Sequence, residues 1–270
     1  MQESLGRIEN RQLLDLDPSR IADSEFAVFS QWGEDGIIQH LLRHVPVSRK
    51  VFIEFGVENY TESNTRFLLV NDRWAGLVID GNQANIDFIK RDSIYWRHNL
   101  KATQAFITRE NINDLIRSNG LEGEVGLLSI DIDGNDYWVW DAINVVSPAI
   151  VIVEYNSRFG PYKAVTIPYD ANFKRDSATG SGIYYGASLS GFANLGRRKG
   201  YALVGSNSAG SNAFFVKRTL KPETLPELTP KEAFVRAQFR ETRGPSGELL
   251  FLDQSQEESI LEHLPLVDVP

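Results

Sequence analysis

Short apolar runs alternate with amphipathic stretches through the middle of the chain. The apolar runs predict buried strands at residues 50–57, 74–80, 101–108, 126–132 and 149–156. The stretches between them carry apolar residues at helical spacing and predict helices at 30–45, 61–73, 82–92, 109–120 and 135–143. Buried strands that alternate with helices indicate a parallel sheet covered by helices on both faces.

The pattern changes after Asn156. Residues 158–182 are rich in Gly, Pro, Tyr and Ser and predict a long loop or lid that shapes a binding site. One more helix is expected at 189–200, and the two apolar runs within 201–218 flank a Gly/Ser/Asn turn, which predicts an antiparallel hairpin. The expected organisation is listed from the N-terminus: an arm at 1–27, the α/β domain at 28–219 and an extension packed on it at 220–270. The apolar stretch "ELLFLD" in the extension is a candidate interface for a homo-oligomer.

Composition narrows the class of protein. The 270 residues are 42% hydrophobic, which suffices for one large domain with a single core. The absence of cysteine excludes disulfides and thiolate metal sites, and the net charge of −8 disfavours a nucleic-acid surface. No apolar run approaches the roughly 18 residues of a membrane span, and the polar N-terminus lacks a signal-peptide core, so a cytoplasmic location is expected.

Acidic residues follow several predicted strands at the edge where α/β sheets bind ligands. Asp80, after the second strand, suits the two ribose hydroxyls of an adenosine, although it could equally cap the following helix. The first strand ends in "EFGVEN", which keeps only Gly56 of a glycine-rich dinucleotide loop and adds Glu58. Negative charge here argues against NAD or FAD and favours a ligand with a positive centre, such as a sulfonium.

The layout "FIEFGV…VIDGN…SIDIDGND…VIVEYN" resembles class I S-adenosylmethionine-dependent methyltransferases, more narrowly the FkbM-like group. The resemblance spans about residues 28–217 and implies a Rossmann-like, mostly parallel seven-stranded sheet with a closing antiparallel hairpin. It also implies S-adenosylmethionine as cofactor and a sugar hydroxyl as methyl acceptor. The cofactor-binding residues expected on this basis are Gln31, Glu54, Gly56, Asn59, Asp80, Gly81 and Asp131.

Three aspartates crowd the end of the fourth strand in "SIDIDGND": Asp131, Asp133 and Asp136. Like charges this close raise one another's pKa, so a counter-charge is expected. Asp131 and Asp133, with Glu154 and Asn156 after the fifth strand, form a candidate site for Mg²⁺ or Mn²⁺, as in metal-dependent O-methyltransferases. Alternatively, Asp133 and Asp136 cap the next helix and Asp131 bonds backbone and ligand. Without a metal, Asp131 or Asp133 is the candidate general base.

Single polar residues give weaker signals. His98 is a second candidate base or a surface histidine, and Gln31 either folds over the cofactor or belongs to a helix cap. Tyr155, Arg158 and Tyr184 are candidate acceptor-binding residues or packing residues of the lid. A non-catalytic nucleotide-binding or scaffold protein that keeps the same fold is the alternative function.

Overall fold

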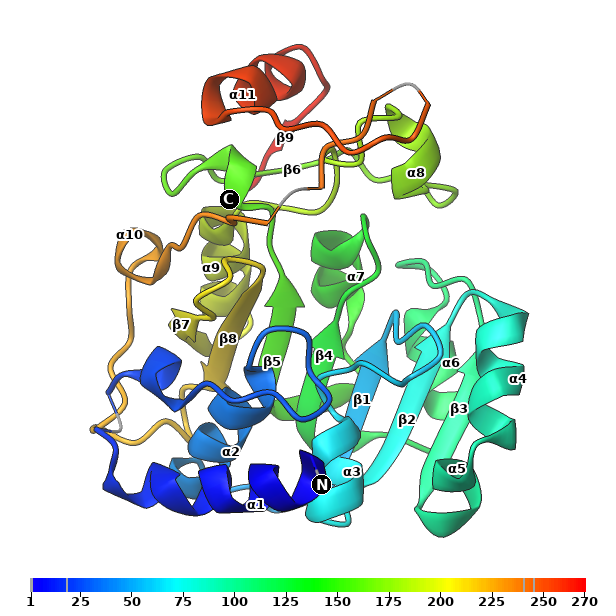
Figure 1. Ribbon diagram of the computed structural model, residues 1–270, viewed down its shortest axis with the longest axis vertical. Coiled ribbons are helices and arrows are strands. Elements are labelled where there is room, and N and C mark those ends of the chain that lie inside the picture. Colours follow the sequence, from blue (N-terminus) through cyan, green and yellow to red (C-terminus); the bar gives the residue numbers. More distant parts are fainter. Residues whose placement is uncertain (1, 18, 240, 245) are drawn as a thin grey trace.

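A seven-stranded sheet in the order β3-β2-β1-β4-β5-β8-β7 forms the centre of the computed structural model, which describes residues 2–17, 19–239, 241–244 and 246–270 (Figure 1). Strands β3, β2, β1, β4 and β5 are parallel, whereas β8 runs antiparallel between β5 and β7. This arrangement confirms the mostly parallel sheet and the closing hairpin predicted from the sequence.

The elements have the following bounds. The strands are β1 (Val51–Phe55), β2 (Ala75–Asp80), β3 (Leu100–Gln104), β4 (Gly123–Ile130), β5 (Val146–Glu154), β6 (Val165–Thr166), β7 (Tyr201–Ser206), β8 (Asn212–Lys217) and β9 (Val267–Asp268). The α-helices are α1 (Gln2–Gln12), α2 (Glu34–His44), α3 (Arg66–Asn71), α4 (Gln83–Arg91), α5 (Ser93–Arg97), α6 (Ile112–Ser118), α7 (Asp136–Ala142), α8 (Arg175–Ala178), α9 (Leu189–Arg198), α10 (Pro230–Ala233) and α11 (Gln254–Glu262). The 3₁₀ helices are η1 (Leu13–Asp15), η2 (Ile21–Ser24) and η3 (Ser157–Phe159).

Helices cover both faces of the sheet because the strands are apolar on both sides. Phe52 of β1 faces a cluster built with α2, α3, α4 and α5. Ile53 and Phe55 of the same strand face the opposite cluster, built with α6, α7 and α9. Burial on both faces explains why the strands read as continuous apolar runs rather than as alternating ones.

Most of the predicted helices and strands are a few residues shorter in the structure than the sequence pattern indicated, among them one helix and one strand at the same edge of the sheet. The helix expected at 61–73 begins only at Arg66, because the preceding residues form an irregular loop held by β1. The strand expected at 101–108 ends at Gln104. Both differences lie at the carboxyl edge of the sheet, where irregular loops replace regular elements.

A buried carboxylate fixes the approach to α2. Asp35 is 1% exposed, and its Oδ2 accepts hydrogen bonds from the backbone N–H groups of Val28, Phe29 and Ser30. The Ser30 hydroxyl donates to the same oxygen. Despite these bonds, burial raises the pKa of Asp35 to about 6. The motif "SQWGEDG" therefore shapes the turn that brings Gln31 to the sheet edge.

We expect Asp35 to make the free energy of unfolding decrease as the pH rises. Its pKa is higher in the folded state than in the unfolded state, so the folded protein holds the proton more tightly and loses this advantage as pH rises through about 6. Between pH 5 and 7.5, the free energy of unfolding of the parent should fall by about 1–2 kcal/mol more than that of Asp35→Asn. Urea unfolding at both pH values measures this difference. The exposed Asp23→Asn serves as the control, and a parallel pH dependence in Asp35→Asn and the parent would contradict the prediction.

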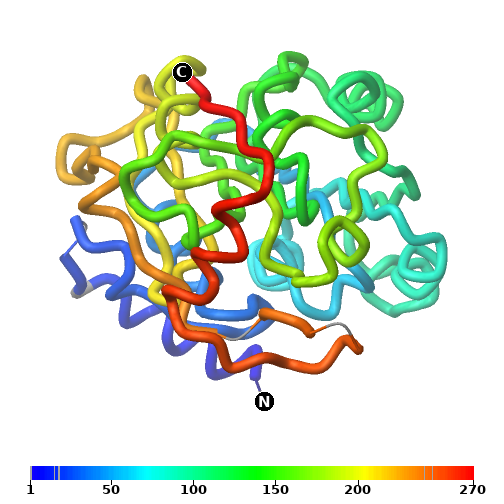
Figure 2. Tube along the Cα trace, turned by 90° about the horizontal axis from the view of Figure 1, so that it is seen from above, coloured from blue at the N-terminus to red at the C-terminus, as the bar shows by residue number. Residues whose placement is uncertain are grey.

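Two segments distant in sequence form a roof above the carboxyl ends of β4 and β5 (Figure 1). One is residues 157–188, which carry η3, β6 and α8, and the other is the C-terminal extension with α11 and β9. The extension crosses over the first segment when seen from above (Figure 2), and β9 pairs antiparallel with β6. Within the extension, Leu249 and Phe251 are exposed, so an oligomer interface at "ELLFLD" stays a prediction. None of the helices in the described ranges has the length and apolar character required to cross a membrane.

Candidate active site

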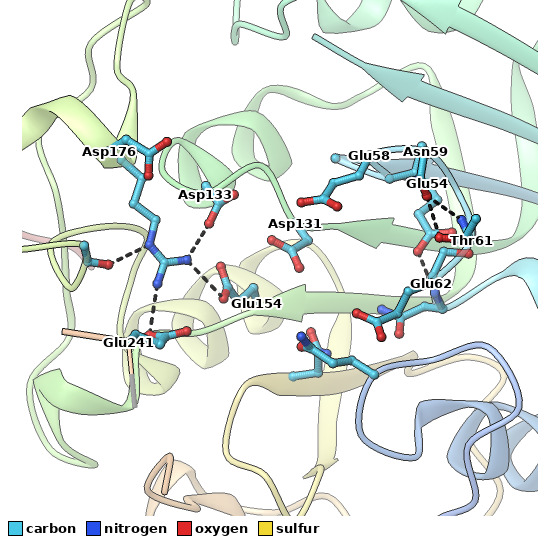
Figure 3. Close-up of a pocket in the computed structure, with 18 of the residues that line it drawn as sticks. Glu54, Glu58, Asn59, Thr61, Glu62, Asp131, Asp133, Glu154, Asp176 and Glu241 are labelled. Atoms are coloured by element: carbon cyan, nitrogen blue, oxygen red, sulfur yellow. Dashed lines mark hydrogen bonds and ion pairs between the residues drawn. The ribbon is translucent and has the colours of Figure 1, made fainter. Parts of the chain in front are cut away.

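A cavity of about 590 Å³ lies beneath the roof at the carboxyl edge of the sheet (Figure 3). Its walls come from the loops after β1 and β4, the end of β5, the turn before α2, strand β8 and both roof segments. Eight carboxylates and two guanidinium groups line it: Glu54, Glu58, Glu62, Asp131, Asp133, Glu154, Asp176, Glu241, Arg175 and Arg243. The size suits a small-molecule ligand, and the excess of carboxylates favours a cationic one.

Close contact between the loops after β1 and β4 shapes the floor. Gly56 has φ +69°, and a Cβ atom there would lie 1.6 Å from the carbonyl oxygen of Asp131. Glu58, Tyr60 and Asp133 also have positive φ, at 47°, 63° and 56°. Such backbone conformations are costly for residues other than glycine and concentrate at functional sites.

Two of the predicted cofactor residues act mainly on the loop after β1. Glu54 accepts hydrogen bonds from the backbone N–H groups of Asn64 and Thr65, and burial raises its pKa to about 7. Asp80 accepts from the N–H groups of Glu58 and Asn82. Glu54 lines the cavity, whereas Asp80 is not among the lining residues. The carboxylate of Asp80 therefore holds the loop after β1 and the turn before α4, whose N-cap is Asn82 rather than Asp80.

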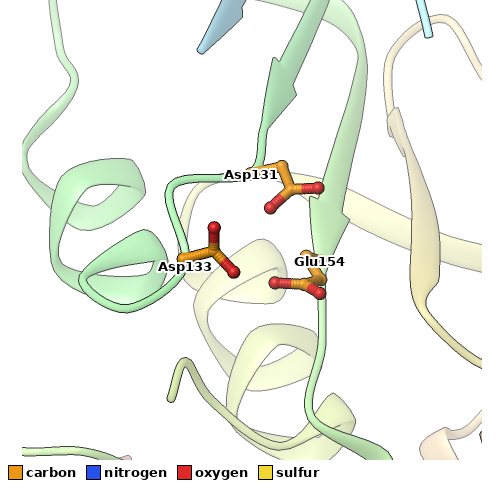
Figure 4. Close-up of side chains that lie close together, drawn as sticks. All are labelled: Asp131, Asp133 and Glu154. Atoms are coloured by element: carbon orange, nitrogen blue, oxygen red, sulfur yellow. The ribbon is translucent and has the colours of Figure 1, made fainter. Parts of the chain in front are cut away.

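Asp131, Asp133 and Glu154 come together as the sequence predicted (Figure 4). One carboxylate oxygen from each lies within 4.8 Å of the others. Burial raises the pKa of Asp131 and of Glu154 well above the usual carboxyl range, and nearby carboxylates raise both further. Both groups therefore favour their protonated form more strongly than an exposed carboxyl group does.

Asp136 takes no part in this cluster. Its Oδ1 accepts a hydrogen bond from the N–H of Ile132, and its Oδ2 accepts one from the N–H of Gly134. Burial raises its pKa to about 6. The third aspartate of "SIDIDGND" thus folds the loop that carries Asp133 and does not cap the helix, because α7 begins at Asp136 with no side-chain cap.

Arg175 of α8 supplies a counter-charge that the sequence did not reveal. Its NH1 lies 2.5 Å from Oδ1 of Asp133 and 4.0 Å from Oε1 of Glu154. Its NH2 lies 2.9 Å from Oε2 of Glu241, and its guanidinium carbon lies 3.7 Å from the centre of the Tyr185 ring. The repulsion among the acids is therefore partly offset by the protein itself.

The cluster also has the donors that a divalent cation requires. Asp131, Asp133 and Glu154 offer hard oxygen ligands at mutual distances that one ion can bridge. Oε2 of Glu154 is buried and accepts no hydrogen bond from the described residues. An unsatisfied buried carboxylate oxygen is costly, so the donor set fits Mg²⁺ or Mn²⁺.

Five predicted site residues lie elsewhere or are already engaged. The side chain of Asn156 donates to the carbonyl groups of residues 183 and 185 and accepts from the N–H of Arg158, so it is not a free metal ligand. Arg158 is buried in ion pairs with two glutamates of the extension. The hydroxyl groups of Tyr155 and Tyr184 donate to backbone carbonyls of the extension. His98 precedes β3 and so lies at the amino ends of the strands, whereas the cavity lies at their carboxyl ends. The prediction of a base at His98 is therefore wrong.

Gln31 and Asn59 line the cavity as predicted, whereas Gly81 does not. The residues that sequence reasoning missed are Arg175, Glu241, Arg243 and Asn212. The sequence predicts residues 158–182 as a lid over the site, and Arg175 lies within this segment, so its position could have been inferred. For Glu241 and Arg243 there was none, because the extension lies far from the strand ends in sequence.

No family model matches the sequence, and no curated protein matches it. Among solved structures, the chain is similar to the N-terminal domain of EvdMO1 with SAH bound, at 9% identity, 80% coverage of this chain, 95% of that chain and a TM-score of 0.44. It is also similar to a Staphylococcus aureus protein provisionally assigned as a caffeoyl-CoA O-methyltransferase (14% identity, 80% and 98% coverage, TM-score 0.48). An O-methyltransferase from Bacillus cereus in complex with SAH gives 11% identity, 77% and 88% coverage and a TM-score of 0.38.

Proposed function

We propose that this protein is an FkbM-like, S-adenosylmethionine-dependent O-methyltransferase that acts on a sugar hydroxyl of a glycan, polysaccharide or glycosylated natural product. The observation that carries the proposal is the acid-lined cavity at the carboxyl edge of the sheet, with Asp131 and Glu154 paired at its centre. The sheet order, with β8 antiparallel beside β5, agrees with the topology implied by the sequence resemblance.

The cavity suits the charge of the cofactor. A sulfonium and an ammonium group both favour a wall of carboxylates over the cationic surface that a pyrophosphate needs. Glu58 and Glu62 on the loop after β1, together with Gln31 and Asn59, lie where the amino-acid end can be bound. Asp80 ends β2 and accepts the N–H of Glu58 on this loop; it does not line the cavity in this structure, and its contact with the ribose is a proposal that calorimetry tests.

The other side of the cavity suits a hydroxyl-rich acceptor. Asp131 and Glu154 can accept the hydroxyl proton, because burial and the neighbouring carboxylates raise their pKa above that of an ordinary carboxyl group. Asn212 and Glu241 offer polar atoms around this pair, and the roof restricts access of water. A divalent cation held by Asp131, Asp133 and Glu154 would polarise and orient the hydroxyl.

Calorimetry with S-adenosylmethionine tests the proposal. We expect the parent protein to bind the cofactor and Asp80→Ala to bind it at least tenfold more weakly. The variant loses charge-assisted hydrogen bonds worth about 1.5–3 kcal/mol each, including the one that holds the N–H of Glu58. Asn85→Ala is the control, because it removes one donor to Asp80 but keeps the carboxylate.

Equal affinity in Asp80→Ala and the parent would overturn the ribose assignment. If the parent itself binds no S-adenosylmethionine, the methyltransferase proposal fails and a scaffold role is favoured.

A further inference from the structure

The guanidinium of Arg175 lies between two sets of acids. On one side is Asp133 of the candidate cation cluster, and on the other is Glu241 of the C-terminal extension. Nε of Arg175 also donates to the carbonyl oxygen of Gly182, 2.6 Å away, and the Tyr185 ring packs against the guanidinium plane. The dashed lines that end on Asp133 and Glu241 in Figure 3 mark these ion pairs.

The two sides differ in exposure. The Asp133 side chain is 57% exposed, whereas that of Glu241 is 19% exposed and that of Arg175 is 16% exposed. An ion pair open to solvent contributes less than one shielded from it. The contacts with Glu241, Gly182 and Tyr185 therefore form the firm attachment of Arg175, and the contact with Asp133 is the one that can be broken.

We propose that Arg175 is a resident counter-cation of the cluster, and that a divalent ion binds by displacing it from Asp133 while Glu241 retains it. This inference rests on the metal site of the proposed function and adds the residue that controls access to it. The guanidinium occupies Oδ1 of Asp133 and places its positive charge beside the other oxygen, so the two cations compete for this carboxylate by contact and by repulsion. Glu154 needs no such release, because Oε2 accepts no hydrogen bond from the described residues and its Oε1 is 4.0 Å from NH1.

Competition of this kind lowers the apparent metal affinity. The protein binds the ion only in the fraction of molecules whose Asp133 is free, and the apparent dissociation constant rises by the inverse of that fraction. Removing the guanidinium makes this fraction approach one. Removing Glu241 has the opposite effect, because Arg175 then has one carboxylate fewer to retain it away from Asp133.

Calorimetric titration of the full chain with Mn²⁺ tests the proposal. Arg175→Gln should bind Mn²⁺ at least tenfold more tightly than the parent, and Glu241→Gln should bind it more weakly. Lys174→Gln is the matched control, because it removes the same charge from the neighbouring exposed position. Its affinity should stay within twofold of the parent value. Circular dichroism verifies that each variant is folded, and S-adenosylmethionine binding is measured on the same samples.

Each outcome discriminates. Tighter binding confined to Arg175→Gln supports displacement. Mn²⁺ affinity that is equal in Arg175→Gln and Lys174→Gln overturns it, while leaving the metal site of the proposed function intact. Absence of Mn²⁺ binding in every variant overturns both this inference and the metal requirement. The cofactor part of the proposed function is decided separately, by the S-adenosylmethionine titration.

Discussion

Replacing Glu154 with Gln is expected to lower methyl transfer at least a hundredfold while S-adenosylmethionine affinity changes by less than about threefold. The amide keeps the shape of the side chain but cannot accept a proton as a carboxylate does or supply a charged metal ligand. Transfer from radiolabelled cofactor to a panel of methyl glycosides and nucleotide sugars measures the rate, and calorimetry measures the affinity. Asp176→Asn is the control, because it removes one carboxylate from the exposed rim of the same cavity.

The same assay separates metal-assisted transfer from transfer by a base alone. Chelation should abolish turnover of the parent, and Mg²⁺ or Mn²⁺ should restore it, with weaker rescue of Glu154→Gln. Full activity after chelation would remove the metal from the proposal and leave Asp131 or Asp133 as the general base. Full activity of Glu154→Gln would remove the carboxyl pair from the chemistry altogether.

Gly56→Ala is expected to prevent folding or to lower the free energy of unfolding by about 4 kcal/mol or more. The new Cβ atom would lie 1.6 Å from the Asp131 carbonyl oxygen, and the backbone at φ +69° disfavours any side chain. Relief requires the ends of β1 and β4 to separate, and these ends form the cavity floor. Urea unfolding followed by circular dichroism measures the loss.

Gly160→Ala isolates the conformational part of this effect. Its φ of +74° is similar, but no heavy atom lies within 4 Å of the added Cβ. Gly160→Ala should lower the free energy of unfolding by about 1 kcal/mol. Equal losses at the two positions would show that the contact between the strand ends tolerates a methyl group.

The sequence predicted the sheet well because each strand is buried on both faces and stands out as an apolar run. The sequence pattern overestimated the length of the helix that ends at Asn71. The apolar pattern extends into the preceding loop, which Glu54 holds in an irregular conformation. Hydrogen bonds of this kind involve residues ten positions apart and leave no periodic signal.

The site was predicted where it depends on strand ends and missed where it depends on the roof. Asp131, Asp133 and Glu154 end neighbouring parallel strands, so topology alone brings them together. Arg175 and Glu241 meet through tertiary contacts between two irregular segments, which no spacing rule describes. Arg158 and Tyr184 were placed in the pocket on residue type, but both instead join the two segments of the roof to each other.

The division of the cavity between sheet and roof has an evolutionary consequence. The strand ends that carry Gly56, Asp131 and Glu154 are constrained by the core, so their replacement threatens the whole fold. Arg175 and Glu241 lie in segments that contribute no strand to the seven-stranded sheet. Selection can therefore alter these segments while the strand ends are inherited unchanged. Under the proposed function, descendants that share this sheet but diverge in the roof would keep one methyl donor and differ in their acceptors.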